Sequence, residues 1–356
     1  MDKIAALNSF SDSGLVYELY GSLPYSLTGS GREGEYLPKV DKNEFEEHVC
    51  HVRSRNFDFN YTMNAPDLLG KEHDKEWLSA LREHLTYLRL SGVNRLTIAN
   101  DFLMQLILRE FPEFRVNVSV IAGVDTPEDA EMYEQMGVEC INLNQHTVNR
   151  DFETLGAIRQ RVGCKLELIC NPACVDHCPR REAHYKVTGH LSQTGMSEQE
   201  YVRAKKFADD CTAWCMTKWL LNPAELLKMP FIRPEDIHEY ESMGIDIMKI
   251  EGRPRDTDWL TEVAKIYLEQ SYDGNILYLT VMPFMKKYLC LIMKNPEQYA
   301  LPLSVDNRKL GTYDFIENIK QLSGKEIENY YTSLVGEVIS GYDHPDIRMI
   351  QQNLTR

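Results

Sequence analysis

The chain has 356 residues and a formal net charge of −15, and 43% of its residues are hydrophobic. This length suits one large α/β barrel with an appendage, and the composition is that of a globular protein with a sizeable core. The negative charge argues against nucleic acid as a partner. No run of about 18 apolar residues predicts a membrane span, and the amino-terminal stretch lacks the apolar core of a signal peptide. We therefore expect a cytoplasmic protein.

Short runs rich in β-branched residues alternate with amphipathic stretches from residue 15 to about residue 270. Helices are predicted between the runs, including one over 75–92 that Gly92 ends and one that begins at Thr126. This alternation is typical of βα units around a parallel sheet. The predicted strands cover 16–20, 57–66, 95–101, 116–123, 138–144, 164–171, 230–232 and 245–253.

Up to eight such units predict a TIM-type (β/α)8 barrel, in which functional groups gather at the carboxyl ends of the strands. A doubly wound sheet is the competing architecture, but it usually carries a GxGxxG loop directly after its first strand, and in the stretch 21–34 that order begins only at Gly29. The pattern changes near residue 271 to longer apolar blocks interrupted by Pro and Asn. We therefore expect a barrel domain over 1–270 and a carboxyl-terminal extension over 271–356.

The stretch LICNPACVDHCPRREAHY (168–185) places Cys170, Cys174 and Cys178 at four-residue steps, and Cys211 and Cys215 follow. Clustered thiols in a chain without an export signal are more often metal ligands or catalysts than disulfides. Short Cys-x2–4-Cys runs completed by a distant cysteine are typical of iron–sulfur sites, and a structural zinc site is the alternative.

We favour iron–sulfur ligation by Cys174, Cys178 and Cys215. Cys211 is the preferred fourth ligand, because Cys170 ends an alternating strand and can point into the barrel wall. The other four cysteines stand singly, and we expect them to be small core residues. These are Cys50, Cys140, Cys164 and Cys290.

Lys249, Glu251 and Arg253 alternate along the last predicted strand, so their side chains share one face. Two cations there suit a carboxylate or phosphate of a substrate, and an internal salt-bridge layer is the alternative. Arg32 and Asn64, near the ends of early strands, are further candidates for substrate binding. The catalytic candidates are His146, Glu167 and His184, which lie at or after the ends of predicted strands or beside the cysteines.

The motifs NPACVDHCPRREAHY and FIRPEDIHEYESMGIDIMKIEGR resemble the peptidase U32 family, whose members are called collagenase-like proteases. The resemblance covers roughly residues 15–270, and SVDNRKL (304–310) is similar to a later family element. It implies a TIM-type barrel with a cysteine-bound [4Fe–4S] cluster. It also implies oxygen-independent hydroxylation, because the better-understood relatives modify quinone precursors or RNA bases, some with prephenate as oxygen source.

The branch that the chain most resembles often carries a further cysteine-rich stretch, which is absent here after Cys290, so no second centre is expected. We expect an iron–sulfur hydroxylase, or an enzyme of a related redox or dehydration step. Its substrate would be a small molecule, a peptide or a carrier-bound compound with negative charge. One alternative is a hydrolase, although the chain lacks GxSxG and HExxH motifs. Another is a non-catalytic iron–sulfur subunit bound to a protein partner.

Overall fold

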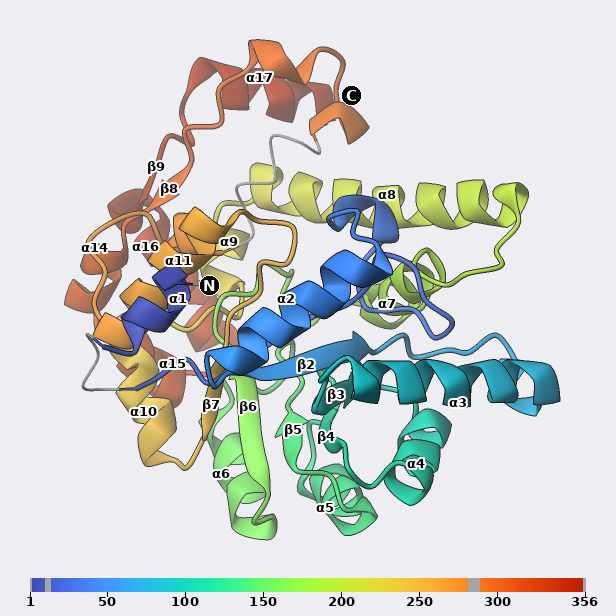
Figure 1. The fold of residues 1–356 in the computed structure, drawn as a ribbon. Coiled ribbons are helices and arrows are strands. Elements are labelled where there is room, and N and C mark those ends of the chain that lie inside the picture. The colour runs from blue at the N-terminus through green and yellow to red at the C-terminus, as the bar shows by residue number, and fades with distance from the viewer. Residues whose placement is uncertain (1, 10–13, 281–288, 355–356) are drawn as a thin grey trace.

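The computed structural model describes residues 2–9, 14–280 and 289–354, and its centre is a curved sheet of seven parallel strands (Figure 1). The strands follow one another in space in chain order, each paired in parallel with the next. They are β1 (Glu18–Gly21), β2 (Asp58–Met63), β3 (Arg95–Ile98), β4 (Arg115–Val118), β5 (Cys140–Asn142), β6 (Lys165–Ile169) and β7 (Ile247–Lys249).

The strand predicted at 230–232 is wrong, and the sheet of the described residues therefore has seven strands rather than eight. Pro230 has no amide hydrogen to donate to a ladder, and the amide of Phe231 turns back to the carbonyl of Met229 at 2.8 Å. The segment keeps one link to the sheet, from the Ile232 amide to the Cys170 carbonyl at 2.8 Å.

The two edge strands, β1 and β7, approach each other through side chains. The Tyr20 hydroxyl donates a hydrogen bond to the Ile250 carbonyl at 3.0 Å, and the Lys249 ammonium lies 4.6 Å from the centre of the Tyr20 ring. The sheet is therefore barrel-like, although no backbone ladder joins its edges in the part of the chain that the structure describes.

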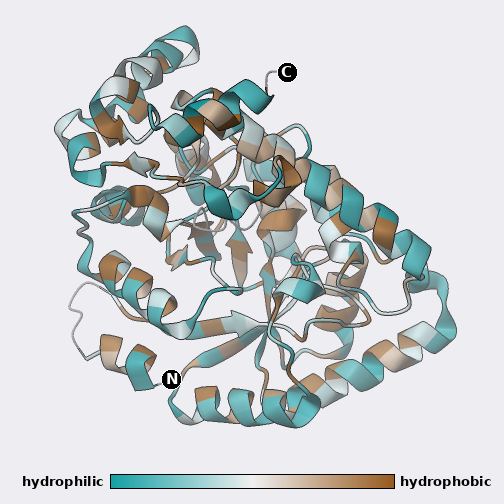
Figure 2. Ribbon diagram, turned by 90° about the horizontal axis from the view of Figure 1, so that it is seen from above, coloured by the Kyte–Doolittle hydropathy of each residue, from teal (hydrophilic) through white to brown (hydrophobic). Residues whose placement is uncertain are grey.

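Amphipathic helices surround this sheet, and both hydrophobic and hydrophilic residues recur along them (Figure 2). The helix predicted over 75–92 is confirmed as α3 (Lys75–Leu90), which buries Trp77, Leu81, Leu85 and Leu88 at helical spacing. The other helices of the barrel region are α1 (Asp2–Leu7), α2 (Lys42–Ser54), α4 (Asp101–Glu110), α5 (Pro127–Met136), α6 (Phe152–Arg161), α7 (Arg181–His190), α8 (Glu198–Leu221), α9 (Ala224–Lys228), α10 (Ile237–Ser242) and α11 (Thr257–Glu269).

The inner face of the sheet is polar, because alternate strand residues carry charged and amide side chains. Asn142 donates to the Glu167 carboxylate at 2.7 Å, and Lys249 binds the same carboxylate oxygen at 2.9 Å. Asn60 donates to Glu18 at 2.9 Å. The residues between them point the other way into the apolar core under the helices, among them Leu96, Val116, Ile141, Leu166 and Leu168.

The carboxyl-terminal extension contains a small antiparallel pair and five helices in its described part. They are α12 (Ile276–Leu279), β8 (Ser304–Val305), α14 (Asn307–Thr312), α15 (Phe315–Gln321), α16 (Gly324–Val338), β9 (Ile339–Ser340) and α17 (Pro345–Leu354). Asn307 links it to the barrel region, because its carbonyl accepts from Arg233 at 2.9 Å and its amide donates to Glu235 at 2.9 Å. None of the described helices has the length and apolar character of a membrane span.

Candidate functional site

Four cysteines come together at the carboxyl end of the sheet, from two segments far apart in sequence. Cys174 and Cys178 lie in the loop that follows β6, and Cys211 and Cys215 lie on α8. Residues four apart share one face of a helix, so both α8 thiols face the loop. This long helix crosses above the sheet (Figure 1). The structure thus assembles the four cysteines that the sequence singled out as ligands.

The four thiols are close enough to influence one another electrostatically. Burial raises the pKa of Cys174 well above its usual range, with contributions from Glu251 and Cys215. Burial also raises the pKa of Cys215 to about 12, and Cys178 and Cys211 add to this effect. Burial raises the pKa of Cys211 as well, while the Arg180 guanidinium opposes this increase.

The four thiols can be compared with the ligands that a zinc ion and an iron–sulfur cluster require. A tetrahedral zinc ion with bonds of about 2.3 Å requires sulfurs about 3.8 Å apart. No three of the described His, Cys, Asp and Glu side chains are drawn together tightly enough for such an ion. Iron–sulfur clusters are also held by four cysteine thiolates, so the type of donor suits either centre.

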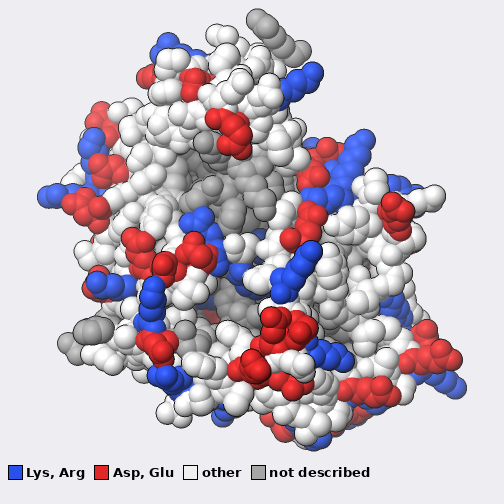
Figure 3. Space-filling view, turned by 45° about the horizontal axis from the view of Figure 1, so that its top comes forward, with Lys and Arg blue, Asp and Glu red and all other residues white. Residues whose placement is uncertain are grey.

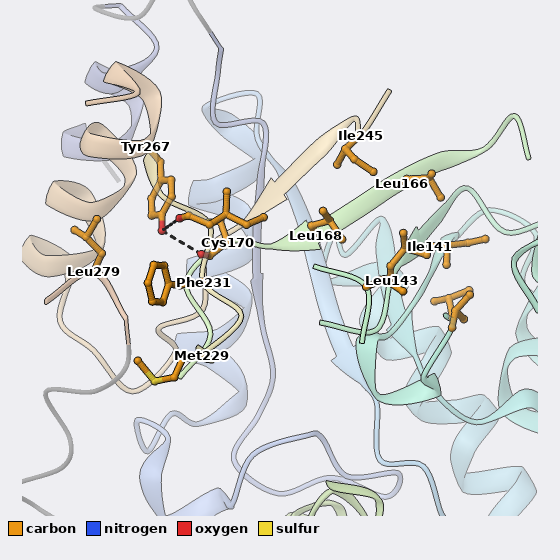
Figure 4. Packing of buried hydrophobic residues seen from close by; sticks show 14 of the residues in the cluster. Ile141, Leu143, Leu166, Leu168, Cys170, Met229, Phe231, Ile245, Tyr267 and Leu279 are labelled. Carbon is orange, nitrogen blue, oxygen red and sulfur yellow. Dashed lines mark hydrogen bonds between the residues drawn. The ribbon is translucent and has the colours of Figure 1, made fainter. Parts of the chain in front are cut away.

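Cys170 lies outside this group. Its side chain continues the alternation of Leu166 and Leu168, which face away from the inner side of the sheet, and its thiol lies 3.3 Å from the Lys249 carbonyl. The Tyr267 hydroxyl donates to the Cys170 carbonyl at 3.2 Å, beside Phe231 and Leu279 (Figure 4). Cys170 is therefore a core residue of the sheet.

The four single cysteines divide into two pairs. Cys140 is buried and Cys164 is half-buried, as core residues should be. The same expectation is wrong for Cys50 and Cys290, which are both exposed. Cys50 lies on α2 next to Val49, and a step of one residue turns a side chain by about 100° around a helix, away from the buried face.

Gln145, His146 and Tyr185 surround the buried side of Cys174. The Tyr185 hydroxyl lies 3.0 Å from Nε2 of His146 and 3.3 Å from Nε2 of Gln145. The Gln145 amide donates to the Cys174 thiol at 3.7 Å. Burial and the nearby Arg181 lower the pKa of His146 to about 3, so its ring is neutral and Nε2 can accept the Tyr185 proton.

The cationic residues predicted for substrate binding meet above the inner face of the sheet. Arg32 forms an ion pair with Glu251 at 3.1 Å. Arg253 donates to the Thr62 hydroxyl at 3.0 Å and has no carboxylate partner among the described residues. Burial and the neighbouring Arg32 lower the pKa of Arg253 to about 10. A cation held in this way is stabilised by a bound anion.

The remaining predicted site residues have partners of their own. Asn64 accepts from the Gly31 amide at 2.8 Å and donates to Ser119 at 3.0 Å, so it supports the loop that carries Arg32. The Glu167 carboxylate accepts hydrogen bonds from Lys249 and Asn142. Burial and Arg32 lower the pKa of His184 to about 4. His177, in contrast, is an exposed residue in the left-handed region at φ 45°.

A cavity of about 790 Å³ lies between β1 and β7 and reaches the inner face of the sheet. Lys249, Arg253, Glu18 and Glu167 line its polar part, while its other walls are largely apolar. Acidic and basic side chains also surround a central hollow on the face shown in Figure 3. The unpaired Arg253 can therefore be reached by a small molecule.

Sequence reasoning missed Gln145, Tyr185, Tyr20 and Glu18. His146, after the end of β5, was predicted as a site residue, but its neighbour Gln145, whose side-chain amide contacts Cys174, was not. Tyr185 belongs to the stretch 168–185 that contains the three cysteines, but only the course of the chain from Cys178 into α7 brings its ring close to Cys174. For Tyr20 and Glu18, the indication in the sequence was their spacing of two residues along the first strand, which puts both side chains on the same face.

Comparisons with known proteins show the family to which the chain belongs. The chain is 28% identical over 267 residues to "Uncharacterized protease MJ1657" of Methanocaldococcus jannaschii, which covers 75% of this chain and 76% of that protein. Its structure is similar to that of the U32 peptidase Mk0906 with a TM-score of 0.41 and 24% identity, over 51% of this chain and 69% of the other. The model of peptidase family U32 matches residues 37–273. The chain therefore belongs to peptidase family U32.

Proposed function

We propose that the protein is an iron–sulfur enzyme that acts on a small anionic substrate by oxygen-independent hydroxylation or a related redox or dehydration step. The observation that carries this proposal is the convergence of Cys174, Cys178, Cys211 and Cys215 at the carboxyl end of the sheet. A [4Fe–4S] cluster bound there supplies electron transfer or Lewis acidity.

The chain's own residues would position the substrate. Arg253 lacks a carboxylate partner in the described ranges and lines the cavity, so its guanidinium can bind a carboxylate or phosphate in bidentate geometry. The ion pair of Arg32 with Glu251 is near both Arg253 and Cys174, because both of its members act electrostatically on each of them. An anion bound to Arg253 would therefore lie near the cysteines.

The residues around Tyr185 form a hydrogen-bonded group beside Cys174 rather than a proton-transfer pair. Burial lowers the pKa of His146 to about 3 and raises the pKa of Tyr185 well above its usual range, so the neutral ring can accept a hydrogen bond from the Tyr185 hydroxyl at 3.0 Å but is a weak base. Glu167 is likewise a weak candidate for a base, because Lys249 and Asn142 already bind its carboxylate.

A peptidase is the second candidate, because the printed names of the relatives are those of a protease and a peptidase. A nucleophilic cysteine needs a lowered pKa. Burial instead raises the pKa of Cys174, Cys211 and Cys215, which disfavours peptide hydrolysis by a cysteine nucleophile at this site.

Anaerobic purification with iron and sulfide determination tests the proposal. We expect broad absorption near roughly 400 nm from thiolate–iron charge transfer, and its loss in Cys174→Ala, Cys178→Ala and Cys215→Ala. Cys50→Ser, at an exposed thiol, is the matched control and should keep its iron. Colourless wild-type protein with one zinc per chain, or release of peptides by iron-free protein, would refute the proposal.

A further inference from the structure

Gln145 is a buried side chain whose contacts point to a role at Cys174. It is only 1% exposed, and its Nε2 lies 3.7 Å from the Cys174 sulfur. This distance suits an N–H···S hydrogen bond, because sulfur is a larger acceptor than oxygen. A thiolate can only accept, so the amide nitrogen is the end of Gln145 that must face it.

The loop that carries Gln145 is held rigidly. Asn144 donates to Asp125 at 2.7 Å and accepts from the His146 amide at 3.2 Å, and Thr147 donates to Asp125 at 2.9 Å. The same Gln145 Nε2 that contacts Cys174 also lies 3.3 Å from the Tyr185 hydroxyl and 3.5 Å from Nε2 of His146. The donor is therefore positioned before any ligand binds.

A hydrogen bond to a cluster sulfur withdraws electron density from it and favours the reduced, more negative state. The effect is strongest for a buried donor, where solvent does not screen the dipole. Arg180, by comparison, acts on Cys211 and Cys215 from an exposed position.

The geometry points to Gln145 as the positioning residue that raises the reduction potential of the cluster through Cys174. This inference rests on the proposed iron–sulfur function. It assigns a role to a residue that neither the cysteine motif nor the anion-binding residues include.

The test is a redox titration of the iron-loaded protein and of Gln145→Leu, which removes the donor but keeps a side chain of similar size. We expect the variant to keep its iron and to have a lower reduction potential. Gln193→Leu is the matched control, because Gln193 is also buried but donates to the Asp67 carbonyl at 2.7 Å. Its potential should equal that of the wild type.

A second readout is the iron–sulfur stretching frequency in the resonance Raman spectrum, measured in H2O and D2O. The deuterium shift should be smaller in Gln145→Leu than in the wild type, because one exchangeable N–H···S contact is gone. If Gln145→Leu does not load iron, Gln145→Met serves in both measurements. A variant with full iron content, wild-type potential and wild-type deuterium shift overturns the inference. Absence of iron from the wild type would instead refute the proposed function, so the two failures can be told apart.

Discussion

Glu18 offers a prediction about stability that can be worked out from the structure. Its Oε1 accepts a hydrogen bond from Asn60 at 2.9 Å, and its charged neighbours are Glu167, Lys249 and Arg95. Burial and the charge of Glu167 raise the pKa of Glu18 to about 7. In the unfolded chain a glutamate titrates near roughly 4.3. The folded protein therefore holds this proton more tightly than the unfolded chain does.

A raised pKa in the folded state contributes stability at low pH that is lost as pH rises through about 7. Each pH unit of difference between the two pKa values is worth about 1.4 kcal/mol, so the full loss is roughly 3.5 kcal/mol. Most of it, about 2.5 kcal/mol, falls between roughly pH 5 and 8.

Glu18→Gln removes this pH dependence, because the amide stays neutral and its carbonyl can still accept from Asn60. From about pH 5 to 8, the free energy of unfolding of the wild type should fall by about 2.5 kcal/mol relative to the variant. Urea titrations of both proteins across this range measure the difference. Glu47→Gln, at an exposed position of α2, is the control and should follow the wild type. Parallel curves for Glu18→Gln and the wild type would mean that Lys249 and Arg95 outweigh burial and keep Glu18 charged.

Three further predictions concern the anion site, the extension and the single cysteines. Arg253→Lys should weaken binding of an anionic ligand by about 1–3 kcal/mol while the melting temperature stays the same, because the bidentate fork is lost; a lowered melting temperature with unchanged affinity would favour a structural ion layer. Asn307→Ala should cost about 1–3 kcal/mol in urea unfolding and speed proteolysis of the extension, since Arg233 and Glu235 each lose a hydrogen bond to Asn307; unchanged proteolysis would contradict this. Cys140→Ser, a buried change, should lower the melting temperature, whereas Cys50→Ser should not; equal effects would refute the assignment of their environments.

Sequence periodicity was enough to place seven strands, but the last predicted strand (245–253) is too long: β7 ends at Lys249, so Glu251 and Arg253 lie in the loop after it rather than on a strand face. Periodicity reports the local backbone, and the side-chain period of two does not depend on which strands are neighbours. The same logic could not distinguish the segment at 230–232 from a strand, because a short apolar run has no period to test. The backbone turn at Met229–Phe231 decided that case.

The cysteine spacing likewise named the four thiols that the fold assembles, since two lie in one loop and two are a helical turn apart. What surrounds them came only from tertiary structure. Gln145 and Tyr185 are 40 residues apart in sequence, yet they lie 3.3 Å from each other.

Lys249, Glu251 and Arg253, at and after the end of β7, show the same division. Lys249 binds Glu167 of β6, and Glu251 binds Arg32 from the loop after β1. Arg253 contacts the Thr62 and Ser22 hydroxyls and the Tyr20 ring. Alternation determines the direction in which a side chain points. The residue that the side chain contacts belongs to another strand or loop, and only the curvature and register of the sheet bring the two residues together.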